Sequence, residues 1–266
     1  MLLRNVATRA VRQARAGRCL PQRSMATEAQ NQRRKVIAYS VGNVEYETAW
    51  DWQKRLIQQR IHAAKQGAPL DHDAVLLLEH PSVYTLGRGA TMSNVKFDPE
   101  KDDCKLIRVD RGGEVTYHGP GQLVVYPILD LNFHKKDLHW YLRQVEEVVI
   151  QTLARFDIKG ERVDGLTGVW VNDESSGVSE MKKIAAVGTH ATKWITMHGF
   201  ALNVTTDLRA FECIIPCGID DRAVTSIELL RSGATFESVE AAACEALQEV
   251  FGVDMITRKC KDPFVL

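Results

Sequence analysis

The chain has 266 residues, of which 45% are hydrophobic and 26% are charged, and its 34 Lys and Arg residues balance 34 Asp and Glu residues. This composition is typical of a soluble globular protein with enough apolar residues to form a core. No apolar run approaches the roughly 20 residues that span a bilayer, which argues against a membrane-spanning enzyme.

The N-terminal 27 residues form a basic leader with six arginines and no acidic residue. On a helical wheel this leader has an arginine half (Arg4, Arg9, Arg12, Arg15, Arg18) and an apolar half (Leu2, Leu3, Val6, Ala10, Ala14), with Val11 as the exception. The pattern predicts a mitochondrial transit peptide over residues 1–30, and therefore a matrix protein. A disordered basic tail or a nucleic-acid-binding arm is the alternative.

The rest of the chain is acidic. Residues 1–30 hold six arginines and one glutamate, so the remaining 28 basic and 33 acidic residues give a net charge of about −5. A body of this charge is poorly suited to bind nucleic acid, and we expect no nucleic-acid partner.

Residues 31–266 contain no repeat, low-complexity segment or long linker, which favours a single domain. Apolar side chains at helical spacing predict helices over residues 45–65 and 137–156, and Thr235 is a candidate N-cap for a last helix. Short apolar or alternating runs predict strands at 73–79, 105–110, 122–131, 168–171, 183–188 and 199–204. This order of elements predicts an α+β fold, in which a mixed sheet is covered by helices.

A glycine-rich stretch, R-G-G-E-V-T-Y-H-G-P-G-Q-L (111–123), follows the second predicted strand. Glycine allows positive φ and a close approach of the backbone to a ligand, so this loop can line a binding groove with N–H groups. A mobile hairpin loop is the alternative. The stretch matches neither the dinucleotide-binding fingerprint nor the P-loop, so neither kind of nucleotide site is supported.

Two adjacent lysines enter a predicted strand in M-K-K-I-A-A-V-G (181–188). In an extended chain Lys182 and Lys183 point to opposite faces, so one of them is directed toward the core. Burial lowers the pKa of a lysine and allows it to act as a base. The alternative is that both are solvated at the end of the strand.

The six cysteines (Cys19, Cys104, Cys213, Cys217, Cys244, Cys260) are scattered and lack the paired spacing of a zinc site. Structural disulfides are not expected in a reducing matrix. Cys217 lies in P-C-G (216–218), where a turn would expose the thiol and let backbone N–H groups converge on it. Cys213 is interpreted as a packed side chain, and His80, His118 and His198 as hydrogen-bonded structural residues. From the residues alone, the site is a possible Cys/Lys pair beside a glycine-rich groove.

Five motifs occur in one order along the chain: L-E-H-P-S-V-Y-T-L-G (78–87), R-G-G-E-V-T-Y-H-G-P-G-Q-L-V-V-Y-P (111–127), K-K-I-A-A-V-G (182–188), H-G-F-A-L-N-V (198–204) and P-C-G (216–218). With these motifs, residues 45–247 resemble the lipoyl(octanoyl) transferase family, and the leader indicates a mitochondrial eukaryotic member. The resemblance implies the fold of biotin and lipoate ligases, a mixed β-sheet with a smaller sheet and flanking helices.

The resemblance also implies the reaction and its partners. An octanoyl group would pass from octanoyl-acyl carrier protein to a specific lysine of a lipoyl domain, in the E2 subunits of 2-oxoacid dehydrogenases and in the glycine cleavage H protein. The family pattern makes Cys217 the nucleophile that carries the acyl group, and Lys183 the residue that lowers the thiol pKa and accepts the proton of the incoming amine. It assigns the acyl groove to Arg111, Gly112, Gly113, Glu114, Val115, Thr116, Tyr117, His118, Ala186, Val187, Gly188, Gly199, Phe200 and Ala201.

No cofactor and no metal are expected, because the acyl group arrives activated as a thioester. One rival interpretation is an ATP-dependent lipoate or biotin ligase, although the sequence lacks a convincing adenylate-binding signature. The other is a non-catalytic acyl-binding protein that has kept the fold.

Overall fold

A computed structural model of the protein describes residues 33–173, 179–215 and 223–265. Residues 33–266 form one compact unit. The predicted leader and Cys217 lie outside the described residues. None of the described helices is long and apolar enough to cross a membrane.

The described part of the chain contains a mixed sheet of eight strands in the order β11-β1-β2-β6-β10-β9-β8-β7. β1 pairs in parallel with β2 and β11, whereas the neighbours from β2 to β7 pair antiparallel. The strands are β1 (Lys35–Asn43), β2 (His72–Glu79), β6 (Gln122–Ile128), β7 (Gly160–Val163), β8 (Leu166–Asp173), β9 (Glu180–Thr192), β10 (Ile195–Asn203) and β11 (Asp254–Lys259).

A smaller sheet of three strands has the order β4-β3-β5, with β3 (Val83–Leu86) between β4 (Leu106–Arg108) and β5 (Val115–His118). The short helix η3 (Leu208–Cys213) packs on it through Phe211, which joins Tyr84 and Tyr117 in one apolar cluster. Two other short helices are η2 (Met92–Asn94) and α3 (Ile227–Leu230).

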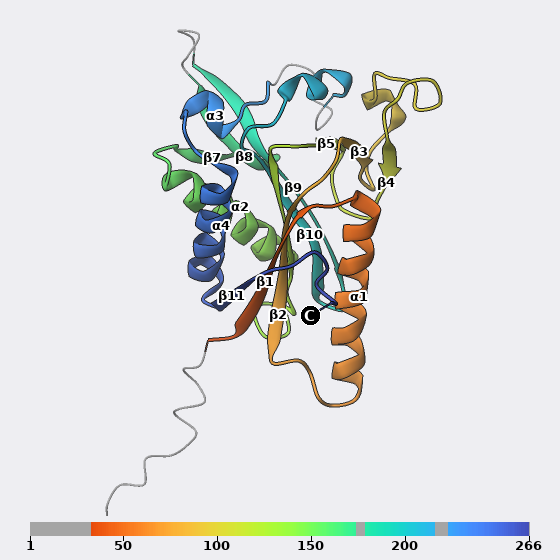
Figure 1. The fold of residues 1–266 in the computed structure, drawn as a ribbon, viewed down its shortest axis with the longest axis vertical. Coiled ribbons are helices and arrows are strands. Elements are labelled where there is room, and N and C mark those ends of the chain that lie inside the picture. Colours follow the sequence, from red (N-terminus) through yellow and green to blue (C-terminus); the bar gives the residue numbers. More distant parts are fainter. Residues whose placement is uncertain (1–32, 174–178, 216–222, 266) are drawn as a thin grey trace, which may run out of the picture. The chain divides into compact units, whose positions relative to one another are not determined.

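Three longer helices cover the large sheet: α1 (Tyr46–Lys65) on one face, and α2 (Leu138–Ala154) with α4 (Phe236–Phe251) on the other (Figure 1). Alternate residues of β2 show why both faces are covered. Val75 and Leu77 pack with α2 and α4, whereas Ala74, Leu76 and Leu78 pack with α1. Successive side chains of a strand point to opposite faces, so an all-apolar strand needs a helix on each side. The predicted α+β fold with a mixed sheet, a smaller sheet and flanking helices is confirmed.

Side-chain caps stabilise the starts of two helices, one of which the sequence predicted. The Asp137 carboxylate accepts a hydrogen bond from the Trp140 N–H (3.0 Å) at the start of α2. Thr235 and Ser238 exchange side-chain to backbone hydrogen bonds at the start of α4, which confirms Thr235 as its N-cap. Each bond satisfies an N–H that the first turn of a helix leaves without a partner.

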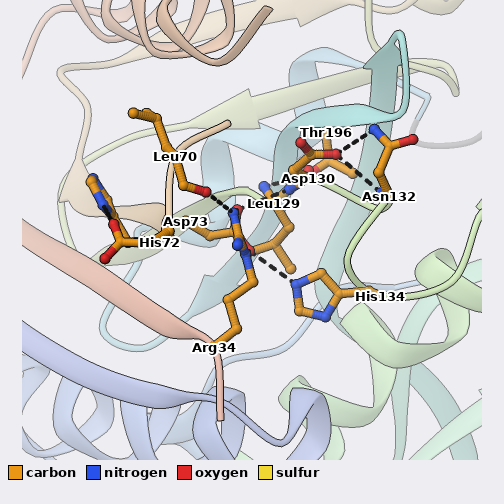
Figure 2. Close-up of polar contacts among 10 residues, drawn as sticks. Arg34, Leu70, His72, Asp73, Leu129, Asp130, Asn132, His134 and Thr196 are labelled. Atoms are coloured by element: carbon orange, nitrogen blue, oxygen red, sulfur yellow. Dashed lines mark hydrogen bonds and ion pairs between the residues drawn. The ribbon is translucent and has the colours of Figure 1, made fainter. Parts of the chain in front are cut away.

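A buried carboxylate ties together segments that are far apart in the sequence (Figure 2). Asp73, at the start of β2, accepts two hydrogen bonds from Arg34 (2.8 and 3.1 Å) and one from His134 (2.9 Å). It also accepts the backbone N–H of Asp130 (3.0 Å). The residue before β1 and the loop between β6 and α2 are thus fixed at the end of the sheet that lies away from the small sheet.

Candidate active site

A cavity of about 240 Å³ lies among β5, β9 and β10 and the loop that precedes β5. Every predicted acyl-groove residue except Tyr117 lines it, and so does Lys183. The lining members of the predicted set are Arg111, Gly112, Gly113, Glu114, Val115, Thr116, His118, Ala186, Val187, Gly188, Gly199, Phe200 and Ala201. Three motifs that are separated in the sequence therefore meet around one space.

Tyr117 is directed away from this space, into the small-sheet cluster. Its ring packs edge-on against Phe211, and its hydroxyl lies 3.0 Å from the Ser82 Oγ. Thr116 and His118, its neighbours on β5, do line the cavity. Thr116 and His118 lie on the face of β5 opposite to Tyr117, as the alternation of side chains along a strand requires.

Arg111 holds the glycine-rich loop in shape. Its guanidinium donates to the carbonyls of Gly112 (3.1 Å) and Glu114 (2.9 Å), and to the carbonyl and hydroxyl of Thr85 (both 2.8 Å). The fixed fork of donors on arginine suits this bracing of a turn. Arg111 therefore stabilises the loop that forms one wall of the cavity.

Two glycines let this loop approach its neighbours closely. A Cβ on Gly188 of β9 would lie 3.0 Å from the Arg111 Cδ and 3.1 Å from the Gly112 carbonyl oxygen. A Cβ on Gly87 would lie within 2.9 Å of an Arg111 guanidinium nitrogen and would also overlap the Gly113 carbonyl. The loop is pinned to β9 by the Gly112 N–H, which donates to the Thr189 carbonyl (3.1 Å).

Lys183 lies on β9 opposite Trp170 of β8 and is 7% exposed. Its backbone N–H donates to the Ala223 carbonyl (3.0 Å), and its carbonyl accepts the Thr225 N–H (2.9 Å). Lys182 has different surroundings, because its Nζ pairs with the Asp173 carboxylate at 3.0 Å. The adjacent lysines point to different sides of the strand, as its alternation predicts.

Strict alternation does not continue beyond the lysines. The pairing of β8 with β9 shifts between Val169, opposite Ala185, and Trp170, opposite Lys183. Ile184 and Ala185 are consequently both buried in the core on the α2 and α4 side. A bulge of this kind inserts one residue into a strand and redirects the side chains around it.

Cys217, the predicted nucleophile, lies outside the described residues, but both neighbouring described residues are anchored. The Ile215 N–H donates to the Asn94 carbonyl (2.8 Å), and the Ala223 carbonyl accepts the Lys183 N–H. Cys213 is half-buried beside the small-sheet cluster, which confirms its interpretation as a packed side chain.

The three histidines singled out in the sequence are all buried and hydrogen-bonded. His80 Nδ1 lies 2.6 Å from the Val44 carbonyl oxygen and Nε2 lies 2.8 Å from the Tyr126 hydroxyl. Because a carbonyl can only accept, His80 carries its proton on Nδ1. Burial lowers the pKa of His80 from 6.5 to about 4. This supports the interpretation of His80 as a structural residue.

His118 begins a row of hydrogen bonds that ends at the backbone of Lys183. The Gln122 amide nitrogen donates to the carbonyl oxygens of Tyr117 (3.1 Å) and of the Asn203 side chain (3.0 Å), so its oxygen is left to accept from His118 Nδ1 (2.8 Å). The Asn203 amide then donates to the Thr225 carbonyl (3.0 Å), and Thr225 donates to Lys183.

His198 has the most constrained geometry in the site. Its φ is +56°, and its N–H donates to the Gln53 side chain at 2.7 Å. Its Nε2 donates to Asp110 Oδ1 at 2.7 Å, and this bond is the main reason why the pKa of Asp110 falls to about 2. Burial lowers the pKa of His198 itself although Asp110 opposes the shift. A non-glycine residue at positive φ is unusual and persists where its surroundings hold it firmly.

Within the described ranges no group of three or more His, Cys, Asp or Glu residues could hold a metal ion. The cavity instead combines a glycine and alanine wall, several buried aromatic rings and one lysine. Such an enclosure can take an apolar chain and present its reactive end to an amine.

Residues 45–248 match the lipoyl protein ligase A/B catalytic domain. An octanoyltransferase from Nostoc sp. is 48% identical over 220 residues, which cover 83% of this chain and 94% of that protein. One from Synechocystis sp. is 50% identical over 217 residues, which cover 82% and 90%. The chain belongs to the lipoyl protein ligase A/B family.

Solved structures of two lipoate ligases share this fold at low sequence identity. A bipartite lipoate protein ligase from Thermoplasma acidophilum superposes with a TM-score of 0.61 at 16% identity and covers 86% of this chain and 87% of that chain. A lipoate-protein ligase A bound with ATP gives a TM-score of 0.62 at 14% identity, with coverage of 86% and 90%. At these identities the likeness shows the fold alone.

Several residues of this lipoyl protein ligase A/B domain line the cavity without having been predicted. They are Tyr46, Gln122, Tyr126, Leu142, Thr167, Thr189, His198, Asn203, Phe211 and Val224. Gln122, Tyr126, His198 and Asn203 stand inside the quoted motifs, so the motifs could have suggested them. Tyr46 and Leu142 come from helices, and only the tertiary packing brings them to the site.

Proposed function

We propose that the protein is an octanoyltransferase that moves an octanoyl group from octanoyl-acyl carrier protein to a lysine of a lipoyl domain. The acceptors would be the lipoyl domains of 2-oxoacid dehydrogenase E2 subunits and the glycine cleavage H protein. The observation that carries the proposal is the identity of about half of the residues with octanoyltransferases over about four fifths of the chain.

The cavity supports the proposal because it collects Lys183 and nearly all of the predicted acyl-groove residues around one space. Its buried, mainly apolar wall suits a saturated acyl chain, which gains free energy when it leaves water. The backbone at Lys183 is held by Ala223 and Thr225, which follow the segment that contains Cys217. Direct hydrogen bonds therefore join Lys183 to the chain that directly follows the segment containing Cys217.

In the proposed mechanism the Cys217 thiolate attacks the carbonyl carbon of the donor thioester. A new C–S bond forms, the donor C–S bond breaks, and the carrier sulfur leaves as a thiolate that takes a proton from the Lys183 ammonium, which leaves Lys183 as the neutral amine. The amine of the acceptor lysine then attacks the enzyme thioester, which forms an amide and returns the cysteine, while Lys183 accepts the proton that the amine loses. Covalent catalysis lets two protein substrates use one site in turn.

The main rival is a ligase that first activates a free acid with ATP. The fold does not separate the two activities, because lipoate ligases share it. Donor chemistry does separate them: the transferase needs a thioester and no ATP, whereas the ligase needs ATP and a free acid. A non-catalytic acyl-binding protein would form no covalent adduct with either donor.

Intact-mass spectrometry of the full chain after incubation with octanoyl-acyl carrier protein, without ATP, tests the proposal. We expect one octanoyl adduct that is absent in Cys217→Ala and retained in Cys213→Ala, the matched cysteine four residues away. An adduct that survives in Cys217→Ala, or one that requires ATP, would contradict the proposal.

We further propose that residues 1–30 direct the protein to the mitochondrial matrix. The support is the arginine-rich, acid-free amphipathic pattern of the leader. A fluorescent protein fused to residues 1–30 should enter mitochondria, and the same fusion with the leader arginines changed to glutamine should not. Equal mitochondrial uptake of the two fusions would contradict this assignment.

A further inference from the structure

The side chain of Lys183 rests on an aromatic ring. Trp170 of β8 is the cross-strand neighbour of Lys183 and is 2% exposed. The Lys183 Nζ lies 4.8 Å from the centroid of the Trp170 ring. An ammonium within about 6 Å of an indole face is attracted by the ring quadrupole, and the attraction grows when water is excluded.

The neighbouring Gly168 leaves the space that this arrangement needs. Its φ is +117°, which side-chain-bearing residues rarely adopt. A Cβ at this position would lie 3.2 Å from the Lys183 Cε, 3.5 Å from Nζ and 2.7 Å from the Ala185 carbonyl oxygen. The β8 backbone therefore passes directly beside the end of the lysine side chain.

A buried carboxylate on α2 holds β8 in this position. Glu146 is fully buried and accepts the Gly168 N–H at 3.1 Å. Its other oxygen pairs with Arg143 (2.7 Å) and Arg162 (3.1 Å), so the carboxylate is doubly neutralised. A strand fixed in this way supplies a rigid support for a reactive side chain.

We propose that Trp170 is a positioning residue that holds the Lys183 ammonium at the wall of the cavity. An indole face attracts an ammonium and cannot take its proton, so this contact fixes the position of the protonated lysine without neutralising it. This role rests on the proposed function, because the position of Lys183 matters to catalysis only if Lys183 serves acyl transfer.

The first test measures the rate at which the full chain becomes octanoylated under single-turnover conditions with octanoyl-acyl carrier protein. Loss of a desolvated cation–π contact should slow Trp170→Leu about tenfold to thirtyfold at saturating donor, and Trp170→Phe less, because phenylalanine keeps a weaker ring. The donor concentration for half-maximal rate should not change. Trp52→Phe, a buried tryptophan in α1, is the matched control and should keep the wild-type rate.

A double-mutant cycle separates positioning from a general loss of packing. If Trp170 acts through Lys183, Trp170→Leu should slow the rate little further in a Lys183→Ala background. The same fold reduction in both backgrounds would overturn the proposal. The cycle with Trp170→Phe gives the same discrimination if the leucine variant does not fold.

A chemical readout tests the contact without acyl transfer. Lys183 should react faster with succinimidyl acetate in Trp170→Phe and Trp170→Leu than in the wild type, whereas Lys182 should not, as measured by peptide mass spectrometry. Unchanged labelling of Lys183 would overturn the positioning role. A wild-type chain that forms no octanoyl adduct would instead overturn the proposed function.

Discussion

Lys182 and Lys183 are neighbours in the sequence, but their surroundings give them different chemistry. Lys182 is neutralised by a carboxylate, because the Asp173 oxygen lies 3.0 Å from its Nζ. This pair raises the pKa of Lys182 and keeps the side chain protonated. Lys183 lines the cavity and lies against the Trp170 ring, which has no basic atom on its face. Of the two, only Lys183 lines the cavity.

Lys183→Ala should therefore slow octanoylation at pH 7 by about 100-fold or more, the usual contribution of a positioned acid or base. Lys182→Ala should reduce the octanoylation rate of the folded protein much less. Lys183→Arg keeps a charge but cannot release its proton, so it should form the adduct better than Lys183→Ala and still fail to pass it to a lipoyl domain. Quenched-flow mass spectrometry measures both steps. Equal reductions of the rate in Lys182→Ala and Lys183→Ala would contradict the role assigned to Lys183.

At the scale of elements, the Asp73 cluster shows how strand ends are held together. Burial opposes ionisation of Asp73, but hydrogen bonds from His134 and Arg34 outweigh it and hold the pKa of Asp73 below its ordinary value. The carboxylate is thus charged and fully enclosed, with partners from two other segments, the residue before β1 and the loop between β6 and α2 (Figure 2). Arg34 also packs over the Phe133 ring at 4.1 Å, which adds an apolar contact between the same segments.

Asp73→Asn should lower the free energy of unfolding by about 3 kcal/mol, because it leaves Arg34 and His134 without the charge that they face in a buried site. Urea denaturation followed by circular dichroism measures the change. Asp71→Asn is the matched control, since Asp71 lies two residues away on the surface, and its stability should stay near that of the wild type. A similar loss in both variants would mean that the buried cluster contributes nothing beyond surface charge.

Local sequence patterns predict the long helices, but they do not predict strands whose sheet partners are far away in the sequence. α1, α2 and α4 begin within a residue of their predicted starts, because three or more turns of apolar spacing are a local signal, to which α2 and α4 add a capping side chain. β1 and β11 were not predicted, although they pair with each other at Lys35 and Asp254. β11 is largely exposed and has no clear apolar pattern. A strand of this kind is defined by its neighbour in the sheet, which a local window cannot show.

The same distinction applies to the site. The glycine-rich loop and the β9 and β10 segments were predicted by resemblance, and the structure brings them together around one cavity. Asp110 was not predicted, because its significance comes from His198, a residue 88 positions away. The bulge that buries both Ile184 and Ala185 also escaped prediction, since an alternating pattern carries no sign of an inserted residue.

At the scale of the whole molecule, several buried histidines make folding sensitive to acid. The rings of His80 and His118 both pack against Tyr46, with centroids 5.0 and 5.7 Å away. Burial holds the pKa of His118 well below its ordinary value, and His80 and His198 shift in the same direction. Protons therefore bind these side chains more readily in the unfolded chain than in the folded one.

The sign of the resulting pH dependence follows directly. When the folded pKa is below the unfolded one, the unfolded state binds more protons, so stability rises with pH and is lost as pH falls below the unfolded pKa of 6.5. For His80, with a folded pKa of about 4, the loss between pH 7 and pH 5 is about 2 kcal/mol. Asp73 and Asp110, whose folded pKa values are depressed, add their loss only below about pH 4, outside this interval.

Urea denaturation at pH 7 and pH 5 should therefore show the wild type at least about 2 kcal/mol less stable at the lower pH. His80→Gln should remove about 2 kcal/mol of that difference, because the group that gains a proton on unfolding is gone. Leu56→Ala, a core variant without a titratable group, should be destabilised by about 3 kcal/mol at both pH values and keep the difference. A wild type that is equally stable at both pH values would show that these buried rings take up protons in the folded state. Equal differences in His80→Gln and the wild type would place the effect on another group.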